Sequence, residues 1–589
     1  MQVKIKASDE EERFSISNTG IGIDWDQIKV QQHLQDFVKI LDDGVLISGQ
    51  DHVSYKIQFD PFRIIQYVNG HETIIVNDND NLYYDAKDLG IHHPAHHTHH
   101  DAHHANETDA VKEPAKKDAP KADEKVDASN VKGYSVGMDF TVNATHMYGL
   151  PQRSDTFRLQ ETGFDHPYRL FNQDRQKTEE RGKNSQPLYG SVPYIAGHSQ
   201  AIDASIAWMN SAETFVFLNH AHHGHKTNSA FISEGNALEF YLLGAEANPK
   251  KLSKKLSELT GYTPMPPRHS LGYHFSKWED NSAHQMSERN HDFTKFGFPV
   301  DVFWFDSEYA QDHQYGEYDH KRFSQDDVMH MNEQVYDSGR RFVIAADPHI
   351  RASNDYFMYK EGLTKQGKLV DDHHIANLFV RDPTAKKVFE GASRPGKSVW
   401  VDFLNESACD YWKDLFHPSV FKGTNYMYGV WNDMNEPSMW KSEENHKQVG
   451  MPMDNTHMTS DGDILQHRWI HNAYGALQQR ATFQGLLRRD RGQQRPFLLS
   501  RSFFFGSQRY GVVSAGSNHA DFEDVELSVN QLLSMAVSGI VNAGHDVPGY
   551  RGVPSDDLFV QFYQLGVYYP FFRANSEKGS GPEMREPWL

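Results

Sequence analysis

The stretch Gly429-Val-Trp-Asn-Asp-Met-Asn-Glu-Pro-Ser438 begins with apolar residues and ends in acidic and amide side chains. This order is typical of a buried strand whose carboxyl end carries functional groups. Seven similar segments lie around it in the second half of the chain: residues 270–273, 302–306, 342–347, 497–501, 511–513, 539–542 and 568–572. Together with residues 429–433 they make eight predicted strands.

A helix is predicted between the second and third of these strands. Ser324-Gln-Asp-Asp327 has the pattern of a capping box, and Gly339 is a stop signal. Three apolar residues between them share one helical face: Val328, Met331 and Val335. Eight strands that alternate with helices predict a (β/α)8 barrel, which we assign to residues 263–589. In that fold, functional side chains lie at the carboxyl ends of the strands.

The first part of the chain has the pattern of a β-sandwich. Short alternating segments are separated by Asp, Asn and Gly turns: residues 43–48, 55–59, 139–142 and 239–243. Residues 92–130 interrupt them with a histidine-rich and then Lys/Asp/Ala/Pro segment, which predicts a disordered insertion. The histidines offer weak metal capture, but a solvated loop is the expected structure because a metal site needs fixed geometry. The predicted sandwich therefore comprises residues 1–91 and 131–262.

Composition excludes several classes of function. The chain has 59 Lys and Arg against 80 Asp and Glu, a net charge of −21, which is the wrong sign for binding nucleic acid. No apolar run approaches about 18 residues, so we expect no membrane span, and we see no signal peptide. The single cysteine, Cys409, cannot form an intrachain disulfide and leaves the compartment open.

Acidic side chains gather at the predicted strand ends. They are Asp306, Asp347, Asp433, Glu436 and Asp546. Three aromatic residues nearby have faces that suit a sugar ring: Trp304, Trp431 and Tyr550. Hydrolysis of a glycosidic bond needs two carboxyl groups at one sugar, one to attack the anomeric carbon and one to protonate the leaving oxygen. A single strand-end aspartate is more often a helix cap or an ion-pair partner, so the motif context must decide.

The motif context is a resemblance to a known family. GVWNDMNEPS at residues 429–438 resembles the nucleophile signature of glycoside hydrolase family 31, and five further motifs resemble that family in the same order: LYGSVP (188–193), SLGYH (270–274), DPHI (347–350), GSQRYG (506–511) and PFFRA (570–574). The resemblance is clear from residue 148 onward and is nearest to the catalytic α subunits of the glucosidase II type.

This resemblance implies a function, a compartment and a partner. Enzymes of this type are retaining α-glucosidases that need no cofactor and no metal. They remove terminal α-linked glucose from N-glycans in the lumen of the endoplasmic reticulum, with a glucosidase II β subunit as partner. A carbohydrate is therefore the expected ligand of this chain.

The resemblance also assigns roles to individual residues. Asp433 matches the nucleophile, and Arg501 matches the arginine that orients the substrate beside it and supplies a positive charge. Four further positions match residues that bind the sugar: Asp306, Trp431, Met434 and Asp174. Of these, Asp174 stands on a loop of the first domain that is expected to reach the cleft.

The acid/base position departs from the family pattern. After GSQRYG the family has Trp-Thr-Gly-Asp-Asn, and its aspartate is the acid/base, whereas this chain has Ser514-Ala-Gly-Ser-Asn518. Ser517 therefore stands at that position. A serine hydroxyl is too weak an acid to protonate a leaving alcohol and then act as a base, so we expect impaired turnover. Three carboxylates farther along are too distant to replace it unless the loop changes: Asp521, Glu523 and Asp524.

Other departures lie in the same pocket and at the end of the chain. Asn575 stands where the family has histidine after PFFRA, and Ala392 and Arg394 replace two tryptophans of the family. The chain stops at Leu589, just after the eighth predicted strand, whereas the family continues through a last barrel helix and β domains. We expect the C-terminal β domains to be absent and the chain to be a fragment or an unstable product.

Three interpretations remain open. The first is a retaining α-glucosidase with a damaged acid/base step. The second is a glucose- or glycan-binding pseudoenzyme that keeps Asp306, Asp433 and Arg501 to hold a sugar. The third is a degenerate copy with no selected function.

Overall fold

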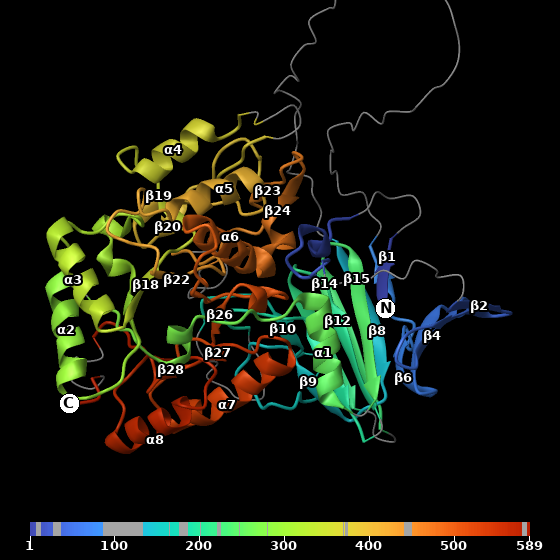
Figure 1. The fold of residues 1–589 in the computed structure, drawn as a ribbon. Helices are drawn as coiled ribbons and strands as arrows, with labels where there is room; N and C mark the ends of the chain where they lie inside the picture. Colours follow the sequence, from blue (N-terminus) through green and yellow to red (C-terminus); the bar gives the residue numbers. More distant parts are fainter. Residues whose placement is uncertain are drawn as a thin grey trace, which may run out of the picture.

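A β-sandwich and a barrel lie side by side in the computed structural model (Figure 1). It describes residues 1–6, 13–26, 37–85, 134–163, 165–175, 187–200, 202–220, 225–246, 248–279, 281–368, 370, 375–440, 450–579 and 586–588. The predicted insertion at residues 92–130 lies outside the described residues.

The sandwich consists of two antiparallel sheets. One has the order β1-β15-β12-β11-β9, and its strands are β1 (Gln2–Ile5), β9 (His146–Gly149), β11 (Tyr194–His198), β12 (Ile202–Trp208) and β15 (Leu238–Glu246). The other has the order β10-β13-β14-β8-β6-β5-β4-β3-β2, with β7 paired to β8. Its strands are β2 (Val38–Leu41), β3 (Gly44–Ser48), β4 (Val53–Gln58), β5 (Arg63–Val68), β6 (His71–Val76), β7 (Tyr83–Tyr84), β8 (Ser135–Val142), β10 (Tyr168–Leu170), β13 (Thr214–His220) and β14 (Thr227–Glu234).

Alternating side chains of both sheets form one shared core. In β5 and β14 every second residue is buried, as expected for strands with one face against the core. Trp208 of the first sheet stacks on Phe231 of the second, with ring centroids 5.5 Å apart. The predicted β segments lie on β3, β4, β8 and β15, so the prediction of a β-rich first domain is confirmed.

The barrel is a ring of parallel strands. Its strands are β16 (Tyr273–Phe275), β17 (Val302–Phe305), β18 (Arg341–Ala345), β22 (Gly429–Asn432), β25 (Leu498–Ser500), β26 (Val512–Ser514), β27 (Ala543–Gly544), β28 (Asp546–Val547) and β29 (Phe572–Ala574). β27 pairs with β26 and β28 pairs with β29, and only His545 separates these two short pieces. They act as one interrupted strand that closes the ring, which confirms the predicted barrel.

Helices cover the outside of the barrel, and two small sheets are inserted between its elements. The barrel helices are α2 (Ala283–Lys295), α3 (Gln325–Asp337), α5 (Glu406–Leu415), α6 (Tyr474–Arg489), α7 (Phe522–Val537) and α8 (Asp556–Gly566). Two helices lie elsewhere (Figure 1): α4 (Phe357–Lys365) contacts the inserted strand β19, and α1 (Pro249–Thr260) packs on the sandwich strands β12 and β15. The inserted strands are β19 (His349–Arg351), β20 (Gly391–Ser393) and β21 (Gly396–Trp400) in one sheet, and β23 (Thr456–Met458) and β24 (Ile464–Gln466) in the other.

The predicted helix after the second barrel strand is confirmed as α3. Ser324 caps it, because its side chain accepts a hydrogen bond from the backbone N–H of Asp327 at 3.2 Å. The three predicted apolar residues are its buried ones. Gly339 follows the helix with a φ of 78°, the left-handed conformation that glycine adopts without strain.

Three predicted strands are wrong in position: residues 270–273, 539–542 and 568–572. The strands begin later, in β16, β27 and β29. Each misplaced segment contains a strongly exposed apolar side chain: Leu271 (64%), Val541 (46%) and Tyr568 (83%). An apolar run in the sequence does not distinguish a buried strand from the turn that leads into it, so the predicted positions are several residues too early.

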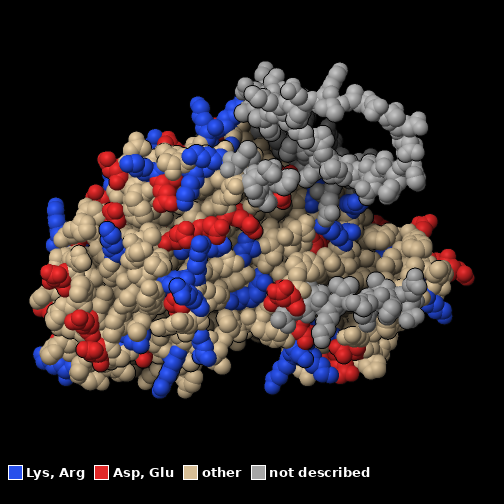
Figure 2. Space-filling view, turned by 45° about the horizontal axis from the view of Figure 1, so that its top comes forward, with Lys and Arg blue, Asp and Glu red and all other residues tan. Residues whose placement is uncertain are grey.

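Charged side chains of both signs are mixed on one face of the molecule (Figure 2). On the face in Figure 2, lysine and arginine side chains lie among aspartate and glutamate side chains rather than in a separate basic region. Within the described residues, no helix is both long enough and apolar enough to cross a bilayer.

Candidate active site

The carboxyl ends of the barrel strands bring most of the predicted site residues together. Asp306 directly follows β17, Asp433 directly follows β22 and Arg501 directly follows β25. All three are buried. Because β17, β18, β22 and β25 are consecutive neighbours in the ring, the side chains at their ends face one region above the barrel.

Arg501 lies among three carboxylates. Its Nε and Nη2 donate hydrogen bonds to Glu436 Oε1 at 2.7 Å and Oε2 at 2.8 Å. Its Nε is 3.2 Å from Asp433 Oδ1, and its Nη1 is 3.7 Å from Asp174 Oδ1. Both oxygens of Glu436 therefore accept hydrogen bonds from Arg501, so this carboxylate positions the arginine.

Met434 and Trp431 flank the predicted nucleophile. Met434 has a φ of 54°, an uncommon conformation for a residue with a side chain, and its sulfur accepts a hydrogen bond from Arg501 Nη2 at 3.0 Å. Trp431 packs inside the barrel against Trp304, with ring centroids 5.7 Å apart. Trp304 is 1% exposed, so it belongs to the barrel core and offers no face to a sugar.

Arg394 is the residue of the site that the sequence did not assign. It lies in the turn between β20 and β21. Its Nη2 donates a hydrogen bond to Asp433 Oδ2 at 3.1 Å, and its Nη1 donates to Asp306 Oδ1 at 3.1 Å. Nη1 also donates to Ser307 Oγ at 2.8 Å. One guanidinium thus joins the predicted nucleophile to the predicted sugar-binding aspartate.

Burial raises the pKa of two aspartates beside Arg394 above the ordinary value. Burial raises the pKa of Asp347 to about 8, against the lowering effect of Arg394 and with further raising by Asp433 and Asp306. Burial likewise raises the pKa of Asp306 to about 6. The single positive charge of Arg394 is shared by several carboxyl groups and cannot neutralise all of them. Asp347, the most deeply buried of them, therefore keeps its proton at neutral pH.

Asp347→Asn should flatten the dependence of stability on pH. The folded-state pKa of Asp347 lies above the ordinary value near 4, so its contribution to stability is complete below about pH 4 and is lost as pH rises to about 8. Asparagine carries no titrating group, so the Tm of the variant should exceed that of the wild type by several degrees at pH 8 and match it at pH 4. Calorimetry between pH 4 and 8 measures this, with Asp410→Asn, at an exposed position of α5, as control. Parallel curves for both variants would contradict it.

Ser517 borders the same site through Tyr189. The Tyr189 side chain lies beside Ser517, and its ring lies under the Arg501 guanidinium at 4.8 Å. The neighbouring Gly516 has a φ of 115°, and a Cβ atom there would be 2.7 Å from the Tyr189 ring. The loop after β26 therefore packs against this tyrosine, which connects Ser517 to Arg501.

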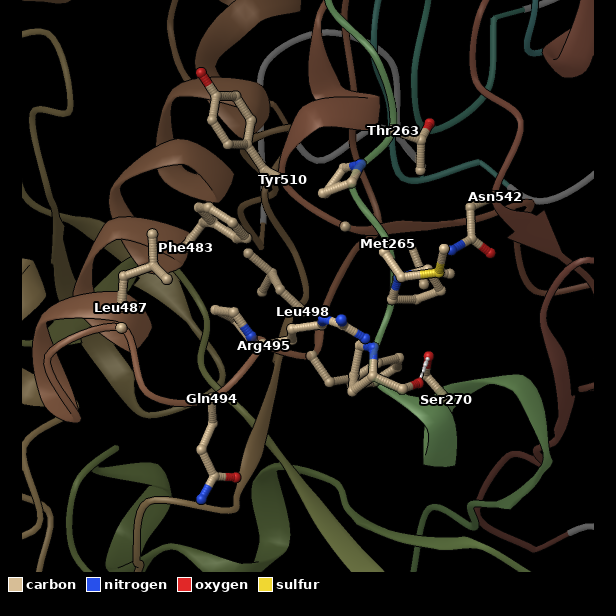
Figure 3. A pocket seen from close by; sticks show the side chains of 18 of the residues that line it. Thr263, Met265, Ser270, Phe483, Leu487, Gln494, Arg495, Leu498, Tyr510 and Asn542 are labelled. Atoms are coloured by element: carbon tan, nitrogen blue, oxygen red, sulfur yellow. Dashed lines mark hydrogen bonds between the residues drawn. The ribbon is translucent and has the colours of Figure 1, made fainter.

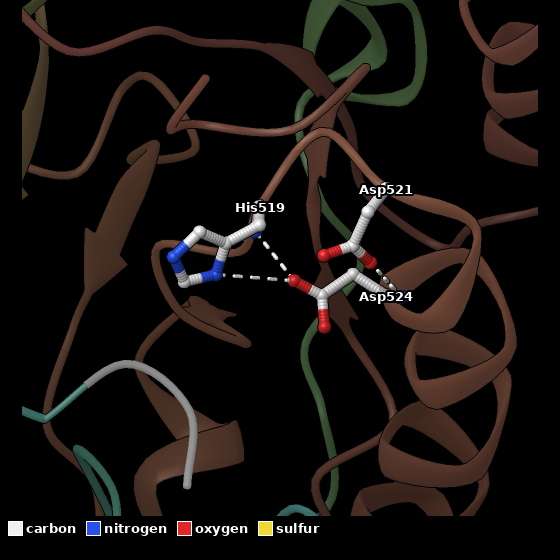
Figure 4. Close-up of side chains that lie close together, drawn as sticks. All are labelled: His519, Asp521 and Asp524. Carbon is white, nitrogen blue, oxygen red and sulfur yellow. Dashed lines mark hydrogen bonds and ion pairs between the residues drawn. The ribbon is translucent and has the colours of Figure 1, made fainter. Parts of the chain in front are cut away.

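Two of the carboxylates that follow Ser517, Asp521 and Asp524, form hydrogen bonds at the start of α7. Asp521 caps α7 by accepting a hydrogen bond from the backbone N–H of Asp524 at 2.7 Å. Asp524 accepts a hydrogen bond from the backbone of His519, and its Oδ2 is 3.5 Å from His519 Nδ1 (Figure 4). Asp521 and Asp524 thus stabilise the start of α7.

Asn575 and Arg573 complete a second ion-paired group at the seventh and eighth strands. Arg573 donates to Asp546 Oδ1 through Nη2 at 2.6 Å and Nε at 3.0 Å. Asn575 Nδ2 donates to Asp546 Oδ2 at 3.3 Å. The Arg573 guanidinium lies over the ring of Trp431 at 5.0 Å. This strand-end aspartate therefore has its own cation.

The loop of the first domain that carries Asp174 is fixed to the barrel two residues earlier. The backbone N–H of Asn172 donates to Asn472 Oδ1 at 2.8 Å, and its side chain donates to Ser502 Oγ at 2.9 Å. Its carbonyl is 2.8 Å from Nε2 of His471, which ends a buried chain of hydrogen-bonded histidines: His457, His467 and His471. These buried contacts hold Asp174 near Arg501.

A separate pocket lies at the opposite end of the barrel. It has a volume of about 390 Å³ and is lined in part by Leu498 and Val512, which begin their strands, and by Pro264 and Met265 of the linker (Figure 3). Because functional groups of this fold lie at the carboxyl ends of strands, we assign this pocket no part in the chemistry.

Two family models match the chain. The model described as "Glycosyl hydrolases family 31 TIM-barrel domain" matches residues 263–589. The model described as "Glycosyl hydrolase 31 N-terminal galactose mutarotase-like domain" matches residues 4–216. The two matches cover the barrel and most of the sandwich.

Known proteins of similar sequence and structure point the same way. Neutral alpha-glucosidase C of Mus musculus is 33% identical over 567 residues, which are 92% of this chain and 60% of that protein. Neutral alpha-glucosidase AB of Mus musculus is 35% identical over 501 residues, or 81% and 50% of the two chains. A glucosidase II alpha subunit solved with alpha3-Glc2 bound matches with a TM-score of 0.78 at 30% identity, over 97% of this chain and 61% of its own.

This chain spans about half to three fifths of the length of those relatives. Both of its matched domains, the order of its motifs and the barrel agree on one assignment. The chain belongs to glycoside hydrolase family 31.

Proposed function

We propose that this chain carries the glucose-cleaving site of a retaining α-glucosidase, with Asp433 as nucleophile and an acid/base step impaired by Ser517. The observation that carries the proposal is the position of Asp433 at the end of β22, 3.2 Å from Arg501 Nε, with Ser517 beside Tyr189 across the same arginine. The mechanism needs two carboxyl groups. Asp433 supplies one of them, and Ser517 has a hydroxyl group at the position of the other.

The chemistry follows from these groups. Asp433 attacks the anomeric carbon to form a glycosyl-enzyme, and Arg501 keeps a positive charge beside it. The leaving oxygen needs a proton at that moment, and the later attack by water needs a base. Ser517 supplies neither efficiently. We therefore infer that substrates with good leaving groups react and ordinary glycosides react poorly.

Similarity to the glucosidase II α subunits suggests the substrate class, partner and compartment. Structures of such subunits hold Glc1Man2 in one case and the regulatory subunit's binding domain in another. For this chain we propose a terminal α-linked glucose of a glycan as substrate, a β-type regulatory subunit as partner, and the endoplasmic-reticulum lumen as location.

An aryl α-glucoside and an unactivated disaccharide should behave differently with the wild-type chain. The aryl group leaves without strong protonation, so it should be released slowly, and azide should accelerate the release because it attacks the glycosyl-enzyme without needing a base. The disaccharide should show no azide effect, since its glycosylation step still lacks an acid. Release of aryl alcohol and of glucose in the two assays measures both.

A second candidate function is a glucose- or glycan-binding pseudoenzyme. The hydrogen bonds from Arg394 favour it, because they occupy Oδ2 of the predicted nucleophile Asp433 and Oδ1 of the predicted sugar-binding Asp306. A folded chain that hydrolyses neither substrate, with or without Ser517→Asp, would overturn the enzyme proposal, and measurable binding of glucose by that chain would support this alternative.

A further inference from the structure

Arg394 reaches the catalytic carboxylates from an inserted hairpin. The turn between β20 and β21 is tied to the barrel, since β21 pairs with β19 and the backbone N–H of Trp440 donates to the carbonyl of Ala392 at 2.9 Å. The Arg394 side chain is only 14% exposed, and its guanidinium lies 5.7 Å from the centre of the Trp278 ring. A fixed turn and an aromatic ring therefore hold the guanidinium in one place.

Asp433 accepts a hydrogen bond from Arg394 and forms an ion pair with Arg501. Arg501 directs its short hydrogen bonds to Glu436 and lies only at ion-pair distance from Asp433 Oδ1. Arg394 Nη2, in contrast, donates directly to Asp433 Oδ2 at 3.1 Å. The predicted nucleophile thus has a cation on each side, and the hydrogen-bonded one comes from the hairpin.

A bound sugar would need the same atoms that Arg394 occupies. Asp306 Oδ1 already accepts from Arg394 and from the backbone N–H of Ser307 at 2.6 Å. Hydroxyl groups that bind Asp306 Oδ1 and an anomeric carbon that approaches Asp433 Oδ2 would both displace the guanidinium. Moving a buried arginine off its carboxylates leaves charges unpaired, which costs binding energy.

We infer that Arg394 is a built-in occupant of the sugar subsite and determines whether that subsite accepts a glucose-like ligand. The inference rests on the proposed function only for the location of the subsite, and it concerns binding rather than turnover. Its guanidinium donates hydrogen bonds to Asp306 and Asp433, so the chain itself supplies the cation of this subsite. A ligand therefore binds in competition with Arg394.

The test is the affinity for 1-deoxynojirimycin, a cationic glucose mimic found in one glucosidase II alpha subunit structure. Arg394→Met keeps side-chain length and removes the charge and the donors, so it should bind the mimic about 100-fold more tightly than the wild type in titration calorimetry. Arg394→Lys, which keeps a cation, should remain weak. Arg488→Met removes an exposed arginine of α6 and should leave the affinity of the wild type unchanged.

Folding is controlled separately, because Arg394→Met leaves several buried carboxylates without their cation. The double variant with Asp347→Asn removes one of those carboxyl groups and should fold with the same gain in affinity. Equal affinity of wild type and both folded Arg394→Met variants would overturn the inference, as would no binding by either variant. Absence of turnover in all variants would contradict only the proposed function.

Discussion

Ser517→Asp combined with Arg394→Met should raise kcat/KM for an α1,3-linked glucose disaccharide by about 10²- to 10⁴-fold over the wild type. The first change supplies the acid that protonates the leaving oxygen, and the second frees Asp433 Oδ2 and Asp306 Oδ1 for the sugar. Glucose release under initial-rate conditions measures the gain. Each single variant should recover only part of it, because either defect alone limits the reaction.

Ser517→Asn in the same Arg394→Met background is the matched control for the restored acid. It has the size of aspartate and cannot donate a carboxyl proton, so its kcat/KM should stay near that of Arg394→Met alone. Equal rates for the aspartate and asparagine variants, both shown to be folded, would mean that position 517 does not hold the acid/base.

Asp433→Asn, introduced into the restored double variant, should lower kcat/KM for an aryl α-glucoside by at least about 10³-fold. The asparagine amide cannot form the glycosyl-enzyme. The Arg501 guanidinium, 3.2 Å from Asp433 in the wild type, cannot turn that amide into a nucleophile. Because the aryl group needs little protonation, the assay isolates the attacking group from the acid.

Asp410→Asn is the control for that series, since Asp410 lies exposed on α5 and its loss should leave kcat/KM unchanged. Azide should not rescue Asp433→Asn with retained configuration, because no covalent intermediate forms. Undiminished hydrolysis by Asp433→Asn would assign the nucleophile to another carboxylate.

Local pattern was sufficient for much of the fold. Ser324 to Gly339 predicts α3 with its cap, its buried face and its end, because capping and helical periodicity depend on residues a few positions apart. The same reasoning placed three barrel strands too early, since exposure of Val541 or Tyr568 depends on what packs above them and not on their own apolar character. Periodicity predicted the elements better than their ends.

For the site, too, the local sequence predicted some features, and others depended on the tertiary structure. A strand-end motif was enough to place Asp433, Asp306 and Arg501 at one end of the barrel, because parallel strands share their carboxyl edge. The role of Glu436 could not be predicted from the sequence, because its hydrogen bonds come from Arg501, which follows a different strand. The sequence did mark Arg394 as a departure from the family motif, which was the only available signal that the residue mattered.

By itself, the sequence determined the barrel, the position of Asp433 within it and the serine at position 517 where the family motif has aspartate, because each depends on chemical identity and local spacing. Only the tertiary structure decided where the Arg394 guanidinium lies. Its contacts with Asp306 and Asp433 join residues 88 and 39 positions apart. Such pairs depend on how the inserted hairpin packs over the strand ends. A buried charged group must pair with an opposite charge, and this packing decides which one lies within hydrogen-bonding distance.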